Sequence, residues 1–187
     1  TAFVETWPDK LAGWKIGATS HVTMERFGVS EPIYGPFFAS DIYSSPATPS
    51  GDRIQHMAIE SEFAYRLGAD LPARATPYTR EEILDAVDAL IPCFEIVGPR
   101  FVKVPFDDVA SAVADCVMNA AMILGAPITH WRGIDAARHS VTLRIDNLVR
   151  HPDLVQYLRA GQNSLPLIVR LDSPVERHVA FQLISYG

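Results

Sequence analysis

The sequence predicts a strand-rich α+β fold. Most of its apolar segments are short, of strand length, and bounded by Gly and Pro, which is typical of strands joined by turns. Only a few segments carry the capping residues that begin a helix. A chain of 187 residues, 48% of them hydrophobic and 20% charged, is long enough for one globular domain with a sizeable core. We therefore expect a single domain over residues 1–187.

The N-terminal part predicts short strands around one helix. Over residues 1–40, apolar groups alternate with Gly and Pro, and the segment "HVTMERFG" (21–28) is expected to be a short helix. The segment "SGDRIQ" predicts a turn into a strand over 56–67, and the Pro- and Gly-containing segment 68–77 predicts the loop that ends it.

A second helix is predicted to begin at Thr79. Thr79 and Glu82 have the spacing of a capping box, in which each side chain bonds the other residue's backbone N–H. The helical face that follows carries Ile83, Leu84, Val87 and Leu90. We expect this helix to extend along that face and to cover a sheet.

The rest of the chain predicts mainly strands. An apolar run over 90–98, a period-two alternation over 140–146 and the late segments 166–171 and 178–184 are typical of strands. The segment 151–161 begins with His-Pro and ends with Gly, which predicts a short helix.

Composition excludes several classes of partner. The formal net charge is −6 and no basic cluster occurs, so nucleic acid is not an expected ligand. No apolar run reaches the roughly 18 residues that span a bilayer, and the first residues lack the order of a signal peptide, so we expect a cytoplasmic protein without membrane contact. Cys93 and Cys116 lie in apolar stretches and are interpreted as reduced core thiols, although they could pair.

The segment "IESEFAY" places two carboxylates one residue apart in a predicted strand. Successive strand side chains point to opposite faces, so Glu60 and Glu62 share one face. Like charges this close raise one another's pKa or require a cation. Either a solvated strand face or a metal ion explains the pair.

A third carboxylate, Glu95, stands alone in an apolar predicted strand. A buried ionised carboxylate is costly, so Glu95 should be paired, protonated or a metal ligand, and Arg100 is an available partner. Together with Glu60 and Glu62 it would offer oxygen ligands that suit Mg²⁺ or Mn²⁺, and no His/Cys cluster points to zinc.

Lys15 is one of only three lysines in the chain and lies between bulky apolar residues in "GWKIG". If its ammonium is desolvated, its pKa falls toward the range useful for proton transfer. The alternative is an ordinary lysine whose stem packs while the ammonium reaches water.

Five segments in order, "GWKIGATS", "GVSEPIYG", "IESEFAYRLGADLP", "IPCFEIVGPR" and "VADCVMNAAMILG", carry a resemblance. The sequence over roughly residues 11–127 resembles the 2-keto-4-pentenoate hydratase branch of the fumarylacetoacetate hydrolase superfamily. The resemblance implies a mixed β-sandwich or roll with a few covering helices, here without the usual N-terminal helices. It also implies a divalent metal bound by Glu60, Glu62 and Glu95, a catalytic Lys15, and a homo-oligomer.

The same resemblance implies a metal-dependent carbon–oxygen lyase of aromatic catabolism. It would act on short 2-oxo or 2-hydroxydienoic acids, most simply as a hydratase. Decarboxylation of a 2-oxo-dioic acid of the 4-oxalocrotonate type and C–C hydrolysis of an acylpyruvate are the catalytic alternatives. A paralogue that keeps the site only to bind a metal or ligand is the non-catalytic alternative.

The segment "EPIYG" departs from the pattern of this branch. Hydratases of this type commonly have "QPDFG", and here Ile33 or Tyr34 takes the position of the Asp. Neither side chain carries negative charge at neutral pH. We expect Tyr34 and Asp41 to be the nearby groups that contact substrate.

Overall fold

The computed structural model describes residues 2–49, 58–102 and 108–134, and the strand segments 143–145, 148–150, 156–157 and 181–185. Four α-helices occur in the described residues: α1 (Ala2–Thr6), α2 (His21–Phe27), α3 (Arg80–Ala86) and α4 (Val109–Ala114). The strands are β1 (Leu11–Gly17), β2 (Ile33–Phe38), β3 (Ile42–Ser44), β4 (Ala58–Leu67), β5 (Val87–Val97), β6 (Asn119–Leu124), β7 (Leu143–Ile145), β8 (Leu148–Arg150), β9 (Gln156–Tyr157) and β10 (Phe181–Ser185). Single 3₁₀ turns are η1 (Ala39–Asp41), η3 (Cys116–Met118) and η4 (Trp131–Gly133). The predicted strand-rich α+β class is confirmed.

Most described strands join one mixed sheet. Its order is β2-β1-β10-β4-β5-β6-β3, β9 pairs with β4, and β7 and β8 form a separate pair. The β10–β4 and β3–β6 pairs are parallel, and the remaining pairs are antiparallel. Strand β10 lies between β1 and β4 although it follows them by more than a hundred positions in the sequence.

Both faces of the central strands β4, β5 and β6 are buried. One face carries an apolar cluster of Ile59, Phe94, Ile96, Ala121 and Ile123. The opposite face carries Ala64, Ala89, Ile91, Cys93, Met122 and Leu124, and Phe37 of β2 packs against them. Each fully buried large apolar side chain contributes about 1.5–3 kcal/mol, so these clusters hold the sheet together.

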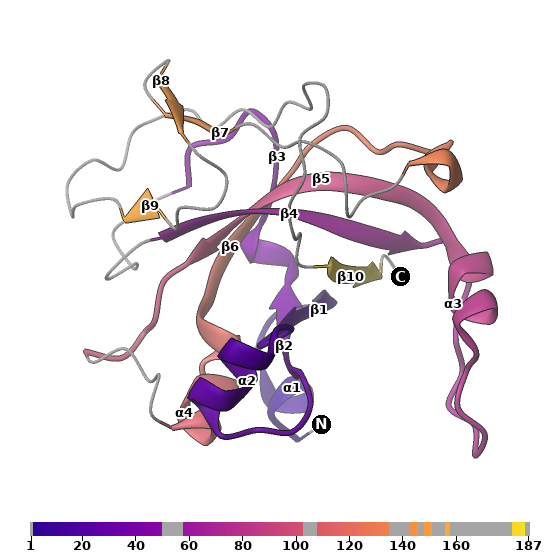
Figure 1. The fold of residues 1–187 in the computed structure, drawn as a ribbon, viewed down its shortest axis with the longest axis horizontal. Helices are drawn as coiled ribbons and strands as arrows, with labels where there is room; N and C mark the ends of the chain where they lie inside the picture. The colour runs from indigo at the N-terminus through magenta and orange to yellow at the C-terminus, as the bar shows by residue number, and fades with distance from the viewer. Residues whose placement is uncertain are drawn as a thin grey trace.

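The sheet is strongly curled. Figure 1 shows the long strands β4 and β5 running across the view above β1 and β2, with α1, α2 and α4 below β2. Gly35 of β2 packs directly on the backbone of Cys116 in η3, where an added Cβ would lie 2.6 Å from the Cys116 carbonyl carbon. Only glycine permits this approach, which brings β2 onto the turn that precedes β6.

The N-terminal end of the second predicted helix is confirmed, but its extent is wrong. Thr79 caps α3 and forms the capping box with Glu82. The helix ends at Ala86, and Val87 and Leu90 belong to β5. Pairing along β4 and burial beside Phe63 outweigh helical periodicity at these positions. Helix α3 consequently lies at the beginning of β5, beyond the edge of the sheet's central strands (Figure 1).

The helix predicted over 151–161 is also wrong where the structure describes it. Gln156 and Tyr157 form β9, which pairs with Ile59 and Ala58. Along that edge of β4, β10 pairs only with 63–67, so β9 takes up backbone groups that β10 does not reach.

The structure describes some of the other predicted elements fully and others only in part. The helix over 21–28 is confirmed as α2, capped by Ser20 and by Gly28 in the left-handed conformation. The strands over 56–67, 90–98, 140–146 and 178–184 are confirmed where described, and the turn at 50–55 and the strand over 166–171 lie outside the described residues. Within the described part, no helix has the length and apolarity needed to span a membrane.

Candidate metal and lysine site

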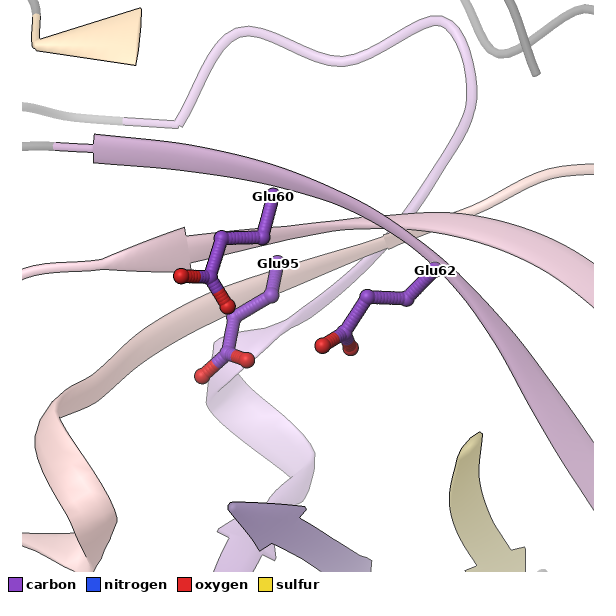
Figure 2. A group of neighbouring side chains, drawn as sticks. All are labelled: Glu60, Glu62 and Glu95. Carbon is purple, nitrogen blue, oxygen red and sulfur yellow. The ribbon is translucent and has the colours of Figure 1, made fainter. Parts of the chain in front are cut away.

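Three carboxylates meet on one face of β4 and β5. In the antiparallel register, Glu60 lies opposite Glu95, and Glu62 lies opposite Cys93. Opposed residues point to the same face, with Cβ atoms about 4.5–5.5 Å apart. One carboxylate oxygen from each glutamate lies within 4.8 Å of the others. Figure 2 shows the three side chains projecting from the same side of the two strands.

This face is not a solvated strand face. Glu62 and Glu95 are buried, and Glu60 is partly buried. The alternative partner proposed for Glu95 is also wrong, because Arg100 Nη1 lies 3.1 Å from Asp115 Oδ1 and pairs there. Strand β5 ends at Val97, so Arg100 follows the strand and lies beside the segment that precedes β6.

Lys15 supplies the positive charge next to Glu95. It lies in the middle of β1, is buried, and places Nζ 2.5 Å from Glu95 Oε1 and 3.3 Å from the carbonyl oxygen of Val117. The interpretation of Lys15 as a lysine with a solvated ammonium is therefore wrong. Strands β10 and β4 stand between β1 and β5 in the sheet, so only the curl of the sheet allows this contact.

The electrostatics of Lys15 differ from the sequence-based expectation. Burial on its own lowers the pKa of the ammonium, but the negative charges of Glu95, Glu62 and Glu60 outweigh burial and raise it. The expected lowering is wrong because the sequence does not reveal how many carboxylates surround Lys15. A raised pKa keeps Lys15 protonated at neutral pH.

The charge balance of the three carboxylates and Lys15 points to a bound cation. Burial raises the pKa of Glu60, the charge of Glu95 raises it further, and Lys15 lowers it. One ammonium balances only one of the three carboxylates when all are ionised, which leaves a charge that a divalent cation would neutralise. The group found in the described residues contains only carboxylates, the ligands that hard cations such as Mg²⁺ and Mn²⁺ prefer.

The two cysteines are free and buried, as predicted. Cys93 lies on the carboxylate face beside Glu62, and burial together with Glu62 and Glu95 raises its pKa well above the ordinary value. Cys93 therefore remains a neutral thiol and packs with Phe37 and Met122 as an apolar wall beside the carboxylates.

The structure does not bring Tyr34 to the carboxylates. Tyr34 lies opposite Ile16, whereas Lys15 lies opposite Gly35, so Tyr34 and Lys15 point to opposite faces of the β1–β2 pair. The Tyr34 side chain is 64% exposed and its ring meets Trp14 edge-on. Its role in substrate binding remains a prediction.

Asp41 lies at the end of η1 and is partly buried. Its negative charge is one of the influences that raise the pKa of Cys116, so it lies near the turn that contacts Gly35. This places Asp41 near the turn whose Val117 carbonyl accepts a hydrogen bond from Lys15. Contact between Asp41 and substrate also remains a prediction.

Sequence reasoning missed the residues that follow α4. Cys116, Val117 and Met118 all have positive φ angles of 54–62°, an unusual run for residues other than glycine. The buried Asn119 follows, and its Nδ2 donates to Glu95 Oε1 at 3.0 Å. The available signal was one amide side chain in the otherwise apolar segment "VMNAAMILG".

The sequence matches no family model. It is nevertheless related to curated hydratases and decarboxylases, and the chain belongs to the 2-keto-4-pentenoate hydratase branch of the fumarylacetoacetate hydrolase superfamily. The chain is 33% identical over 128 residues to 2-keto-4-pentenoate hydratase of Paraburkholderia xenovorans (strain LB400), covering 67% of this chain and 46% of the relative. It is 32% identical over 129 residues to 4-oxalocrotonate decarboxylase of Pseudomonas putida, covering 68% and 47%.

The chain spans about half the length of the curated relatives that it matches. Among solved structures, 4-oxalocrotonate decarboxylase from Pseudomonas putida G7, complexed with magnesium and adipate, superposes with a TM-score of 0.69. This superposition covers 80% of this chain and 56% of that chain at 24% identity, so the two share a fold.

Proposed function

We propose that this chain is a divalent-metal-dependent hydro-lyase that acts on short 2-oxo or 2-hydroxydienoic acids, as 2-keto-4-pentenoate hydratases do. The observation that carries the proposal is the approach of three glutamate side chains to within 4.8 Å, with the ammonium of Lys15 on one of them. Similarity to proteins named as hydratases supports the choice of reaction.

Glu60, Glu62 and Glu95 would hold the metal, which we propose to be Mg²⁺ or Mn²⁺. Such a cation, when bound, polarises a carbonyl oxygen and stabilises negative charge that develops on a 2-oxo acid. The metal assignment is supported by the all-carboxylate set of ligands and by two decarboxylase structures, complexed with magnesium and adipate and with calcium and acetate.

Lys15 would act beside these ligands. Its ammonium, buried beside Glu95, would donate a proton to a substrate atom that gains negative charge. Glu95 and the Val117 carbonyl fix the position of Nζ. The apolar wall of Cys93, Phe37 and Met122 would limit the access of water to this side of the site.

Decarboxylation of a 2-oxo-dioic acid is the second candidate function. The segment "EPIYG" favours it, because Ile33 or Tyr34 stands where hydratases have an Asp. Decarboxylation would not need such a carboxylate to orient water. Curated relatives named 4-oxalocrotonate decarboxylase support it as well. Acylpyruvate hydrolysis remains a lesser alternative, because no histidine is placed by a motif to activate water.

We also propose the wider features implied by the family. The curled sheet supports a roll of the fumarylacetoacetate hydrolase type, within a single catalytic domain. A cytoplasmic homo-oligomer with a small 2-oxo acid as its ligand remains a prediction.

A substrate panel tests the proposed function. Purified protein would be assayed with 2-hydroxypentadienoate, 4-oxalocrotonate and an acylpyruvate, each with Mg²⁺, with Mn²⁺ and after EDTA treatment. We expect metal-dependent turnover of the first or second compound, followed as loss of conjugated absorbance, and a loss of that turnover in Glu62→Gln. Ketonisation without hydration would assign the missing function to the Asp that "EPIYG" lacks. Turnover of none of these compounds would favour the non-catalytic alternative.

A further inference from the structure

One oxygen of Glu95 accepts two hydrogen bonds from different parts of the fold. Lys15 Nζ donates to Oε1 from β1, and Asn119 Nδ2 donates to the same oxygen from β6, at 2.5 and 3.0 Å. All three side chains are buried. Two donors on one oxygen fix the rotation of the carboxylate about its last side-chain bond, and therefore also the direction of Oε2.

The backbone around Asn119 is held in an unfavourable conformation. The left-handed turn Cys116–Met118 is bracketed by Arg100, whose Nη1 donates to the carbonyl oxygens of Asp115 and Asn119 and pairs with the Asp115 carboxylate. The amide of Gly98 donates to the Met118 carbonyl oxygen at 2.8 Å. Such a conformation persists only where the surroundings determine it, and strained turns of this kind cluster at functional sites.

The turn holds two hydrogen-bonding groups in place at the buried ion pair. The turn directs the Val117 carbonyl to Lys15 Nζ and the Asn119 amide to Glu95 Oε1, so both members of the buried ion pair are held from one short segment. The Asn119 amide also donates to the Ala121 carbonyl oxygen at 3.5 Å, so its shorter hydrogen bond, at 3.0 Å, is the one to Glu95 Oε1. An apolar side chain of similar size could not supply that bond.

We propose that Asn119 is a positioning residue that orients Glu95 as a metal ligand. This inference rests on the proposed metal site, and it assigns to Asn119 no contact with metal or substrate. Partners that orient a ligand in this way typically contribute 10- to 100-fold to metal affinity.

The test is a pair of double-mutant cycles with Mn²⁺ binding, measured by electron paramagnetic resonance, as the readout. Asn119→Ala would be made in the wild-type, Glu95→Gln and Glu60→Gln backgrounds. We expect it to weaken Mn²⁺ binding about tenfold in the wild type and in Glu60→Gln, and less than about twofold in Glu95→Gln, because coupled residues are not additive. Glu60→Gln is the matched control, since it also removes one carboxylate but not the partner of Asn119.

Equal losses in all three backgrounds, or no loss in the wild type, would overturn the proposal. If Asn119→Ala fails to fold, Asn119→Leu keeps the branched arrangement of side-chain heavy atoms while removing the amide, and the same pattern is expected. Mn²⁺ binding with the expected coupling but no turnover of any substrate would contradict the proposed function and leave the role of Asn119 intact. Turnover and Mn²⁺ affinity that are both unchanged in Asn119→Ala would support the proposed function and contradict the role of Asn119.

Discussion

Two ion pairs of nearly equal length differ completely in their surroundings. Lys15 Nζ lies 2.5 Å from Glu95 Oε1, with side chains that are 6% and 0% exposed. Arg74 Nη2 lies 2.6 Å from Glu82 Oε2 at the start of α3, with side chains that are 36% and 43% exposed. The second pair has two parallel hydrogen bonds and is further supported by the Thr79 backbone.

The difference teaches that contact distance does not reveal the role of a charge. Around Arg74 and Glu82 water solvates both charges, so such a pair contributes little to stability. Burying Lys15 and Glu95 carries a desolvation penalty that their attraction only partly offsets, and an apolar pair of similar volume would often be as stable. Burial of Lys15 among three carboxylates is therefore better explained by chemistry at the site than by stability.

The largest expected effect is on turnover. Replacing Lys15 by Ala removes the proton donor of the proposed reaction, and we expect kcat to fall 10²–10⁴-fold, equivalent to about 3–5 kcal/mol of barrier. The assay would use saturating Mg²⁺ at a temperature at which the variant is folded. Lys10→Ala, at an exposed lysine, is the matched control and should retain its turnover. Near-normal kcat in Lys15→Ala would remove Lys15 from the mechanism.

The next effect is on the stability of the metal-free protein. Lys15→Met leaves Glu95 buried without its cation, and we expect the free energy of unfolding to fall by about 3–5 kcal/mol in urea titrations. Adding Glu95→Gln should restore most of this loss, because both charges are then gone. Mg²⁺ should restore part of it, since a ligand that binds only the folded state stabilises that state. A loss no larger than that of Lys10→Met would show that burial of the pair is energetically unimportant.

The smallest effect is expected at the exposed pair. The hydrogen bonds from Arg74 and from the Thr79 backbone lower the pKa of Glu82 from 4.5 to about 2. The contribution of the Glu82 charge to stability should therefore be complete above pH 4.5 and should disappear as pH falls through about 2. The free energy of unfolding of the wild type and of Glu82→Gln, compared between about pH 2 and pH 4.5, would measure this contribution. High salt should reduce the difference between the two proteins. A difference that is independent of pH would contradict this assignment.

The sequence was most informative where a pattern is local. Period two on a strand is enough to place Glu60 and Glu62 on one face, and a capping box is enough to locate the start of α3. The end of α3 could not be predicted in this way, because tertiary pairing decides whether Val87 continues a helix or begins a strand.

The partner of Glu95 was a harder problem. Arg100 is near in sequence, yet Lys15, eighty positions away, is the residue that reaches Glu95. That contact depends on the curl of the sheet, which no short-range pattern encodes. The same holds for Asn119 and its left-handed turn, whose geometry follows from bonds to Arg100 and Gly98.

The position of β10 has a consequence for how the chain assembles. Hairpin β1–β2 and the neighbouring strands β4, β5 and β6 can each form from contacts that are short in sequence, but β10 must enter between β1 and β4 to join them. Contacts of such long sequence separation form slowly, and unpaired strand edges remain exposed until they do. During synthesis, Lys15 and Glu95 would therefore both leave the ribosome well before the strand that joins their halves of the sheet.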